Sequence, residues 1–88
     1  MSLSNTFAAL SDENRRKILE ILKKKELPVS EIAKHLTITG ATLSHHLDIL
    51  RRADLVSSRR EGQQIIYSVN LSVFEDISEK IVKFLKKK

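Results

Sequence analysis

Hydrophobic residues recur at helical spacing through most of the chain, and polar residues fill the positions between them. The clearest pattern lies between Thr39 and Arg52, where Leu43, Leu47 and Leu50 form a stripe at i, i+4 and i+7. Thr39 is placed to cap this helix, because a Thr hydroxyl accepts hydrogen bonds from free amides of the first turn. The outward face is small and polar at first and basic toward its end, with Ala41, Thr42, His45, Asp48 and Arg52. An ordinary surface helix and a helix that lies in the major groove of DNA both fit this pattern.

Three shorter helices are predicted before this one. The first spans residues 4–10, and core packing and a dimer contact fit its apolar face of Leu3, Phe7 and Leu10 equally well. The second begins at a cap provided by Ser11 or Asp12. The third follows Pro28, and its inward positions are Val29, Ile32, Ala33 and Leu36. A turn containing Gly40 then leads into the helix described above, which predicts a helix-turn-helix whose second helix enters the groove.

After Asp54 the hydrophobic period changes from 3.6 to 2, which predicts a β-hairpin. Its strands span residues 55–59 and 64–69, and Gly62 supplies the positive φ that hairpin loops often need. Ile65, Tyr67 and Val69 are expected on the core side. The exposed tip carries two arginines and two glutamines, namely Arg59, Arg60, Gln63 and Gln64. Closing the core does not require these side chains, so the hairpin is interpreted as the wing of a winged helix.

A last helix is predicted over residues 71–86, capped by Asn70. Its acidic residues come early and its lysines late, which complements the helix dipole. Its apolar residues follow a spacing of three and four: Leu71, Phe74, Ile77, Ile81, Phe84 and Leu85. Because the core should already be closed by this point, the pattern favours an antiparallel dimer contact over packing within one chain.

The composition indicates one small folded domain over residues 1–88. Of the 88 residues, 41% are hydrophobic and 31% are charged, and there is no cysteine. No signal peptide is visible, and no apolar run approaches the roughly 20 residues needed to span a bilayer. We therefore expect a cytoplasmic protein without disulfides or membrane insertion. The net charge of +5 favours an acidic partner, with nucleic acid the first candidate and an anionic membrane surface the second.

Three groups of residues occur in an order typical of one family. They are residues 7–12 with Arg15, Ile18 and Leu19; residues 44–47 with Leu50 and 53–56; and residues 59–62 with Tyr67. In these residues the chain resembles the ArsR/SmtB family of bacterial winged-helix repressors over nearly its whole length. Glu13 stands where the family often has Pro, and Glu is acceptable in a first helical turn.

The resemblance implies a mainly α fold with a small β-hairpin, a winged helix-turn-helix of order α-α-α-α-β-β-α. It implies a homodimer through the first and last helices, with the interface residues Phe7, Leu10, Phe74, Ile77, Ile81 and Phe84. It also implies a sequence-specific repressor that binds a palindromic operator in double-stranded DNA. The operator would be read by Thr39, Ala41, Thr42, Ser44 and His45, and the wing contacts would be Arg59, Arg60, Gln63 and Gln64.

The residues argue against the metal sites that many family members use. Pro28 and Ser30 stand in the segment that carries a Cys-Val-Cys sequence elsewhere, and residues 71–88 contain no His. Glu75, Asp76 and Glu79 alone make a poor zinc site. His45 and His46 point about 100° apart on a helix, and His35 is alone. No metal or other cofactor is therefore expected, and the chain resembles the branch in which a partner protein relieves repression.

Other classes of function fit less well. A winged-helix module that binds an acidic protein through its basic face is the main alternative. A peripheral membrane protein is disfavoured because residues 71–88 have a regular dimer-type stripe and few aromatic residues. An enzyme is not expected, because the chain has no Gly-rich phosphate loop, no HExxH sequence and no Cys nucleophile.

Overall fold

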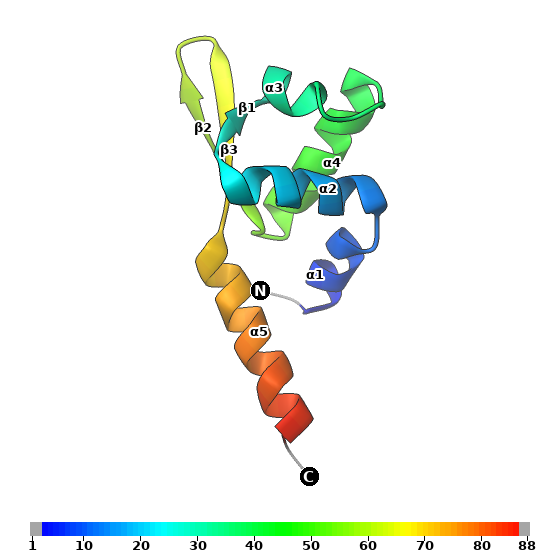
Figure 1. The fold of residues 1–88 in the computed structure, drawn as a ribbon, viewed down its shortest axis with the longest axis vertical. Helices are drawn as coiled ribbons and strands as arrows, with labels where there is room; N and C mark the ends of the chain where they lie inside the picture. Colours follow the sequence, from blue (N-terminus) through cyan, green and yellow to red (C-terminus); the bar gives the residue numbers. More distant parts are fainter. Residues whose placement is uncertain (1–2, 87–88) are drawn as a thin grey trace.

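The computed structural model describes residues 3–86, which form five helices and three short strands (Figure 1). The elements in chain order are α1 (Leu3–Leu10), α2 (Glu13–Lys24), β1 (Leu27–Pro28), α3 (Val29–Ala33), α4 (Gly40–Arg52), β2 (Val56–Glu61), β3 (Gln64–Val69) and α5 (Leu71–Lys86). The predicted helix-turn-helix is α3 and α4, and the predicted wing is β2 and β3. The mainly helical winged fold is confirmed.

One hydrophobic core lies between α2, α4, the base of the wing and the first half of α5. The predicted stripe of α4 points into it, since Leu43, Leu47 and Leu50 are all buried. The other buried members are Ala9, Ile18, Leu19, Leu22, Ile32, Ala53, Leu55, Val56 and Ile77. The core therefore joins every helix of the described chain to the wing.

Side-chain hydrogen bonds cap the starts of α2 and α4, and a left-handed residue ends α4. The Asp12 side chain accepts from the Arg15 amide at 3.1 Å and caps α2, and the hydroxyl of Thr39 accepts from the Thr42 amide at 3.1 Å and caps α4. At the far end of α4, Asp54 adopts a left-handed conformation with φ 62°. The Leu55 amide then donates to the Leu50 carbonyl at 3.0 Å, a bond pattern that terminates many helices.

The sheet has the order β1-β3-β2, and both pairings are antiparallel. The hairpin loop is shorter than predicted, because β2 runs to Glu61 and only Gly62 and Gln63 remain between the strands. Gly62 has φ 61°, as the sequence predicts. The third strand, β1, was not expected. It consists of two residues that pair with Tyr67 and Ile66 of β3.

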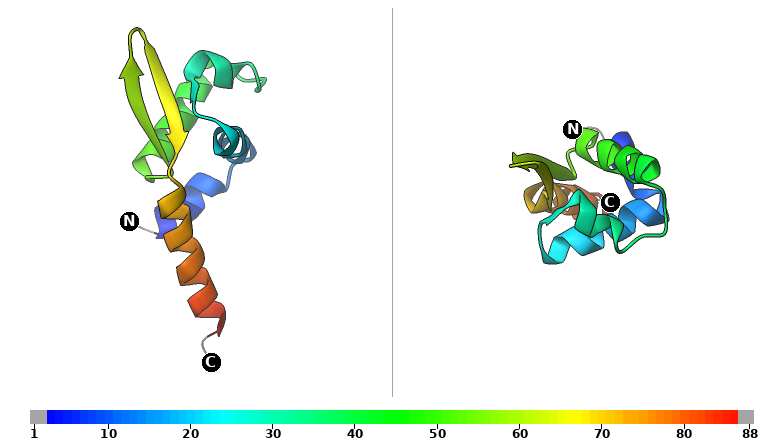
Figure 2. Two further views of the ribbon diagram at one scale, coloured as in Figure 1. Left: turned by 60° about the vertical axis from the view of Figure 1, so that its left-hand side comes forward. Right: turned by 90° about the horizontal axis from the view of Figure 1, so that it is seen from above.

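Helix α5 leaves the body at the end opposite the wing tip and extends away from it (Figures 1 and 2). The molecule measures 50 × 23 × 20 Å, and α5 lies along its longest dimension. Helix α1 lies at the same end of the body as the start of α5, whereas the wing tip and the first turn of α4 lie toward the other end. No helix among residues 3–86 is long and apolar enough to cross a membrane.

Three expectations about single residues were wrong. Ala33 is exposed because α3 ends there, so it does not face the core. Ile65 shares a face with Tyr67 and Val69 but lies beyond the core near the wing tip, where it is 42% exposed. Its neighbour Ile66 is the buried residue, on the opposite face of the sheet. Asn70 contributes its backbone carbonyl to the start of α5, but its side chain makes other bonds, described below.

Candidate nucleic-acid interface

The first turns of α4 present a polar surface toward the same end of the molecule as the wing tip (Figure 1). The five residues expected to read DNA are all exposed there: Thr39, Ala41, Thr42, Ser44 and His45. Thr39 has two roles, because its oxygen accepts from the Thr42 amide while its hydroxyl donates to the Thr42 hydroxyl oxygen at 2.9 Å. Four of the five side chains are small, and a surface of this kind can approach base edges closely in a major groove.

The inner side of α4 contains a buried histidine whose role was not predicted from the sequence. His46 is 8% exposed, and its Nδ1 accepts from the Arg15 guanidinium at 3.0 Å. A guanidinium can only donate, so the neutral ring carries its proton on Nε2, which lies 3.7 Å from the Asp12 carboxylate. The signal was present, since His46 lies three residues after Leu43 and therefore on the same inner face.

Arg15 and Arg16 hold the end of α1 rather than presenting charge to a partner. Arg15 donates through Nε to the Ala9 carbonyl at 2.8 Å and through a second nitrogen to the Ala8 carbonyl at 3.2 Å. Arg16 donates to the Leu10 carbonyl at 2.6 Å. These are carbonyls at the C-terminal end of α1, which have no partner within the helix. Together with His46, Arg15 links α1, α2 and α4.

The wing arginines lie on opposite faces of the hairpin. In the strand register Arg59 is paired with Ile66 and Arg60 with Ile65. Successive side chains of a strand point to opposite faces of the sheet, so the two arginines lie on different faces. Arg59 forms a forked pair with the Glu26 carboxylate, and its Nε donates to Glu61 at 2.9 Å. These two carboxylates raise the pKa of Arg59, and the hydrogen bonds from Arg59 lower the pKa of Glu26 below its ordinary value. Through its bonds to Glu26, Arg59 therefore links the wing to the segment before β1.

Arg60 is the one arginine of the described chain whose guanidinium has no hydrogen-bond or ion-pair partner. Arg51 and Arg52 both pair with the Asp48 carboxylate at 2.8 Å, and the other three arginines are bonded as described above. The guanidinium of Arg60 is exposed near the wing tip, together with the amides of Gln63 and Gln64. An unpaired cation at this position is available to bind a phosphate.

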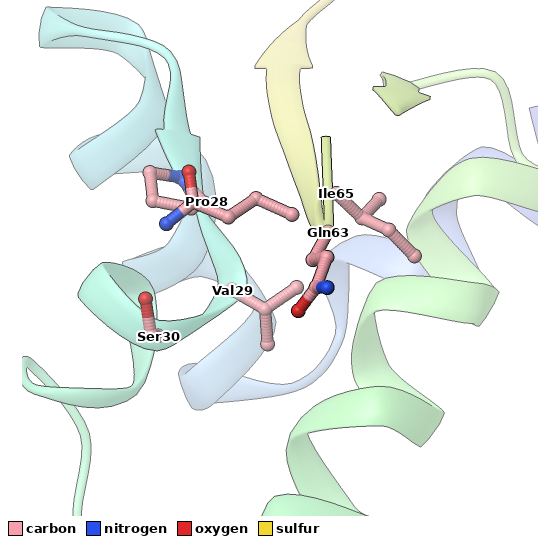
Figure 3. A pocket seen from close by; sticks show the side chains of 6 residues that line it. Pro28, Val29, Ser30, Gln63 and Ile65 are labelled. Carbon is pink, nitrogen blue, oxygen red and sulfur yellow. The ribbon is translucent and has the colours of Figure 1, made fainter. Parts of the chain in front are cut away.

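A shallow groove of about 260 Å³ separates the hairpin turn from the start of α3 (Figure 3). Val29 lies on the α3 side and Gln63 on the wing side, with Pro28 and Ile65 completing the apolar part. Gln63 therefore lines a groove between the wing turn and the start of α3.

The apolar residues expected at a dimer interface differ in their surroundings. Phe7 is 52% exposed and Phe84 is 77% exposed, and Ile81 is also exposed. Leu10 and Phe74 are half-buried against the core. Ile77 is 6% exposed within one chain, so it completes the core and is not a free contact residue. Most of the uncovered apolar surface of α5 thus lies beyond Ile77, where Val82 and Leu85 extend it, and Leu71 at the start of the helix is exposed as well.

Metal-binding groups do not come together in the described structure. The rings of His45 and His46 have centroids 6.2 Å apart, with one ring outside and one inside the fold. No three His, Cys, Asp or Glu side chains among residues 3–86 are placed to hold one ion. His35 is exposed in the turn after α3.

Known bacterial regulators are similar to this chain in both sequence and structure. The family described as "Bacterial regulatory protein, arsR family" matches residues 12–58. The transcriptional repressor SdpR of Bacillus subtilis is 41% identical over 85 residues, which cover 97% of this chain and 94% of that protein. The arsenical resistance operon repressor of Staphylococcus aureus is 33% identical over 79 residues, covering 90% and 76%. An ArsR-like transcriptional regulator from Rhodococcus sp. RHA1 superposes with a TM-score of 0.86 at 29% identity, covering 93% and 77%. HlyU from Vibrio cholerae gives a TM-score of 0.77 at 29% identity, covering 97% and 92%.

Proposed function

We propose that this chain, which belongs to the ArsR family of bacterial regulatory proteins, represses transcription as a homodimer on a palindromic operator. The proposal starts from its membership of that family, which makes it a DNA-binding transcriptional regulator rather than an enzyme. In this proposal each α4 reads one half-site in the major groove, and each wing contacts the flanking DNA. The base-reading residues are Thr39, Ala41, Thr42, Ser44 and His45.

The observation that carries this proposal is the unpaired guanidinium of Arg60 in the wing, together with the exposed polar surface of α4. The wing tip and the first turn of α4 lie toward the same end of the molecule (Figure 1), which supports one duplex meeting both elements. We propose that Arg60, Gln63 and Gln64 contact the phosphates or the minor groove. Arg59 was expected to do the same, and we assign it a smaller share because two carboxylates already surround it.

The proposed dimer uses the uncovered apolar surface at the other end of the molecule. Phe7 of α1 and the residues Ile81 and Phe84 of α5 would pack against the same residues of a second copy. A two-fold interface is self-complementary, which is what a palindromic operator requires of its protein. Leu10, Phe74 and Ile77 would support this surface from beneath.

We further propose that the regulator works in the cytoplasm without a metal site or other cofactor. The chain has no thiolate ligands, because it has no cysteine. Release from the operator would then come from another signal, and a partner protein is one such signal.

The experiment that tests the proposal replaces two side chains of the reading surface. We expect Thr42→Ala with His45→Ala to leave helicity and dimerisation intact, because both side chains are exposed. Operator binding should weaken by about 1–3 kcal/mol for each base that the variant no longer reads, while binding to scrambled DNA persists through the phosphates.

The matched control for this test is Thr37→Ala with His35→Ala. These residues are of the same types and are also exposed, but they lie before α4. The control should keep the full preference for the operator over scrambled DNA at the same salt concentration. If the Thr42/His45 variant also keeps that preference, α4 is not the reader, and binding to an acidic protein becomes the better account of the basic face.

A further inference from the structure

Asn70 connects the end of the wing to the start of α5, and its side chain bonds to two other elements. Its Oδ1 accepts from the Ser57 hydroxyl of β2 at 2.7 Å. Its Nδ2 donates to the Asp54 carbonyl, just after α4, at 2.8 Å. Its backbone amide donates to the Leu55 carbonyl at 3.0 Å. The end of α4, the start of the wing and the start of α5 are therefore joined at one residue.

This bonding is unusual for an Asn at the start of a helix. A capping Asn normally turns its side-chain oxygen toward the free amides of the first turn. Here the Val73 amide is bonded to the Asn70 backbone carbonyl at 3.1 Å, and the side chain faces away from α5. The Asp54 carbonyl can only accept and the Ser57 hydroxyl donates, so the position needs one donor and one acceptor. An amide of this length provides both.

Besides Asn70, three apolar side chains near the base of α5 hold the helix in its direction. Only Val73, Phe74 and Ile77 of the described α5 residues pack against the core, and the helix beyond them is exposed. The 16 residues of α5 make a rod about 24 Å long, so a tilt of about 10° at its base moves the far end by about 4 Å. Such a movement is large compared with the width of a hydrogen bond to a base edge.

We propose that Asn70 is a positioning residue that fixes the direction of α5 relative to α4, and thereby the distance between the two reading helices of the dimer. This inference rests on the proposed function, in which α5 holds the dimer and α4 reads DNA. Half-sites lie about 34–36 Å apart when they are separated by one turn of DNA. A dimer whose α5 helices are fixed in direction will select that separation, and one whose helices tilt freely will not.

The variant Asn70→Asp separates this role from helix capping. Aspartate has the same shape and keeps an acceptor for Ser57, but it places an oxygen against the Asp54 carbonyl. Aspartate is also as good a cap as asparagine, and its charge is favourable at a helix N-terminus. If Asn70 only starts α5, this variant should be neutral or stabilising. Asn14→Asp, in the first turn of α2, is the control for the added negative charge.

The first measurement compares operators whose half-sites have the natural separation with operators that contain inserted base pairs. We expect Asn70→Asp to lower the preference for the natural separation by about three- to tenfold, the equivalent of removing one hydrogen bond. Ser57→Ala should lower it by less, because the Asp54 bond remains. Affinity for a single half-site and the mass of the dimer should match those of Asn14→Asp. An unchanged preference for the natural separation overturns the inference.

The second measurement requires neither DNA nor a particular oligomeric state. The chain has no cysteine, so spin labels can be placed at Ser44→Cys of α4 and Lys80→Cys of α5 without background labelling. With excess unlabelled chain, the wild type should give one narrow distance, and Asn70→Asp a broadened or shifted one. An unchanged narrow distance overturns the inference. A wild type that is monomeric or indifferent to half-site separation instead refutes the proposed function, while the label distance still reports on Asn70.

Discussion

The most direct prediction of the proposed dimer concerns Phe84, which is 77% exposed in a single chain. Burying a Phe side chain fully contributes about 1.5–3 kcal/mol, so covering the exposed part of this one is worth about 1–2 kcal/mol. A symmetric dimer buries two copies, which doubles the contribution to about 2–4 kcal/mol. Phe84→Ala should therefore raise the dissociation constant of the dimer by roughly 25- to 1,000-fold.

The matched control is Ile77→Val, which removes one methyl group from a residue that is 6% exposed within its own chain. This variant should lower the free energy of unfolding by about 0.5–1.5 kcal/mol and leave the dimer largely intact. Sedimentation equilibrium over a range of protein concentrations measures the dissociation constant, and denaturant unfolding measures stability. Phe84→Ala should change the first quantity strongly, whereas Ile77→Val should change mainly the second.

A wild-type chain that sediments at 10.1 kDa at micromolar concentration would refute this reasoning outright. So would a Phe84→Ala variant that dimerises as tightly as the wild type. In the second case the two-fold contact would have to lie elsewhere on the molecule, and the direction of α5 would no longer determine the separation of the half-sites.

Three further predictions concern the wing and the absence of a cofactor. Arg60→Ala should weaken binding to all DNA sequences alike and reduce the slope of log affinity against log salt concentration by about 1. Arg59→Ala should change that slope less, and equal slopes for both variants would contradict the distinction between the two arginines. Glu26→Gln should destabilise the protein at neutral pH, because the lowered pKa of Glu26 means that its bond to Arg59 stabilises the fold above the ordinary value of 4.5. The difference in unfolding free energy between this variant and the wild type should fade as the pH falls below 4.5, and a constant difference would contradict the assignment. DNA affinity in gel-shift titrations should be the same with EDTA as with added zinc, and a stoichiometric bound metal would contradict the metal-free proposal.

Features that depend on neighbouring residues were predicted well. The cap at Thr39, the inward stripe of α4 and the positive φ of Gly62 all follow from spacings of a few residues, and the structure contains each of them. The exposure of the polar residues in the first turns of α4 follows from the same periodicity, because the residues opposite a buried stripe must face outward. The family resemblance relied on these same segments.

Features that depend on residues distant in sequence were missed. β1 has only two residues and includes Pro28, so it has no period of its own and exists through its pairing with β3. Asn70 occupies a capping position, and its partners lie 13 and 16 residues earlier in the chain. Arg59 and Arg60 look equivalent in the sequence, but the strand register sends one to Glu26 and leaves the other unpaired. No local pattern contains that information.

In the proposed complex with DNA, the bond between the hydroxyls of Thr39 and Thr42 affects how α4 meets a base edge. The proton of Thr39 points to the Thr42 oxygen, at 2.9 Å, and occupies one of its two acceptor positions. The proton of Thr42 is then left to point outward. In that proposed complex Thr42 would offer the groove one donor and one remaining acceptor position, and the donor suits the N7 and O6 of guanine, the N7 of adenine and the O4 of thymine.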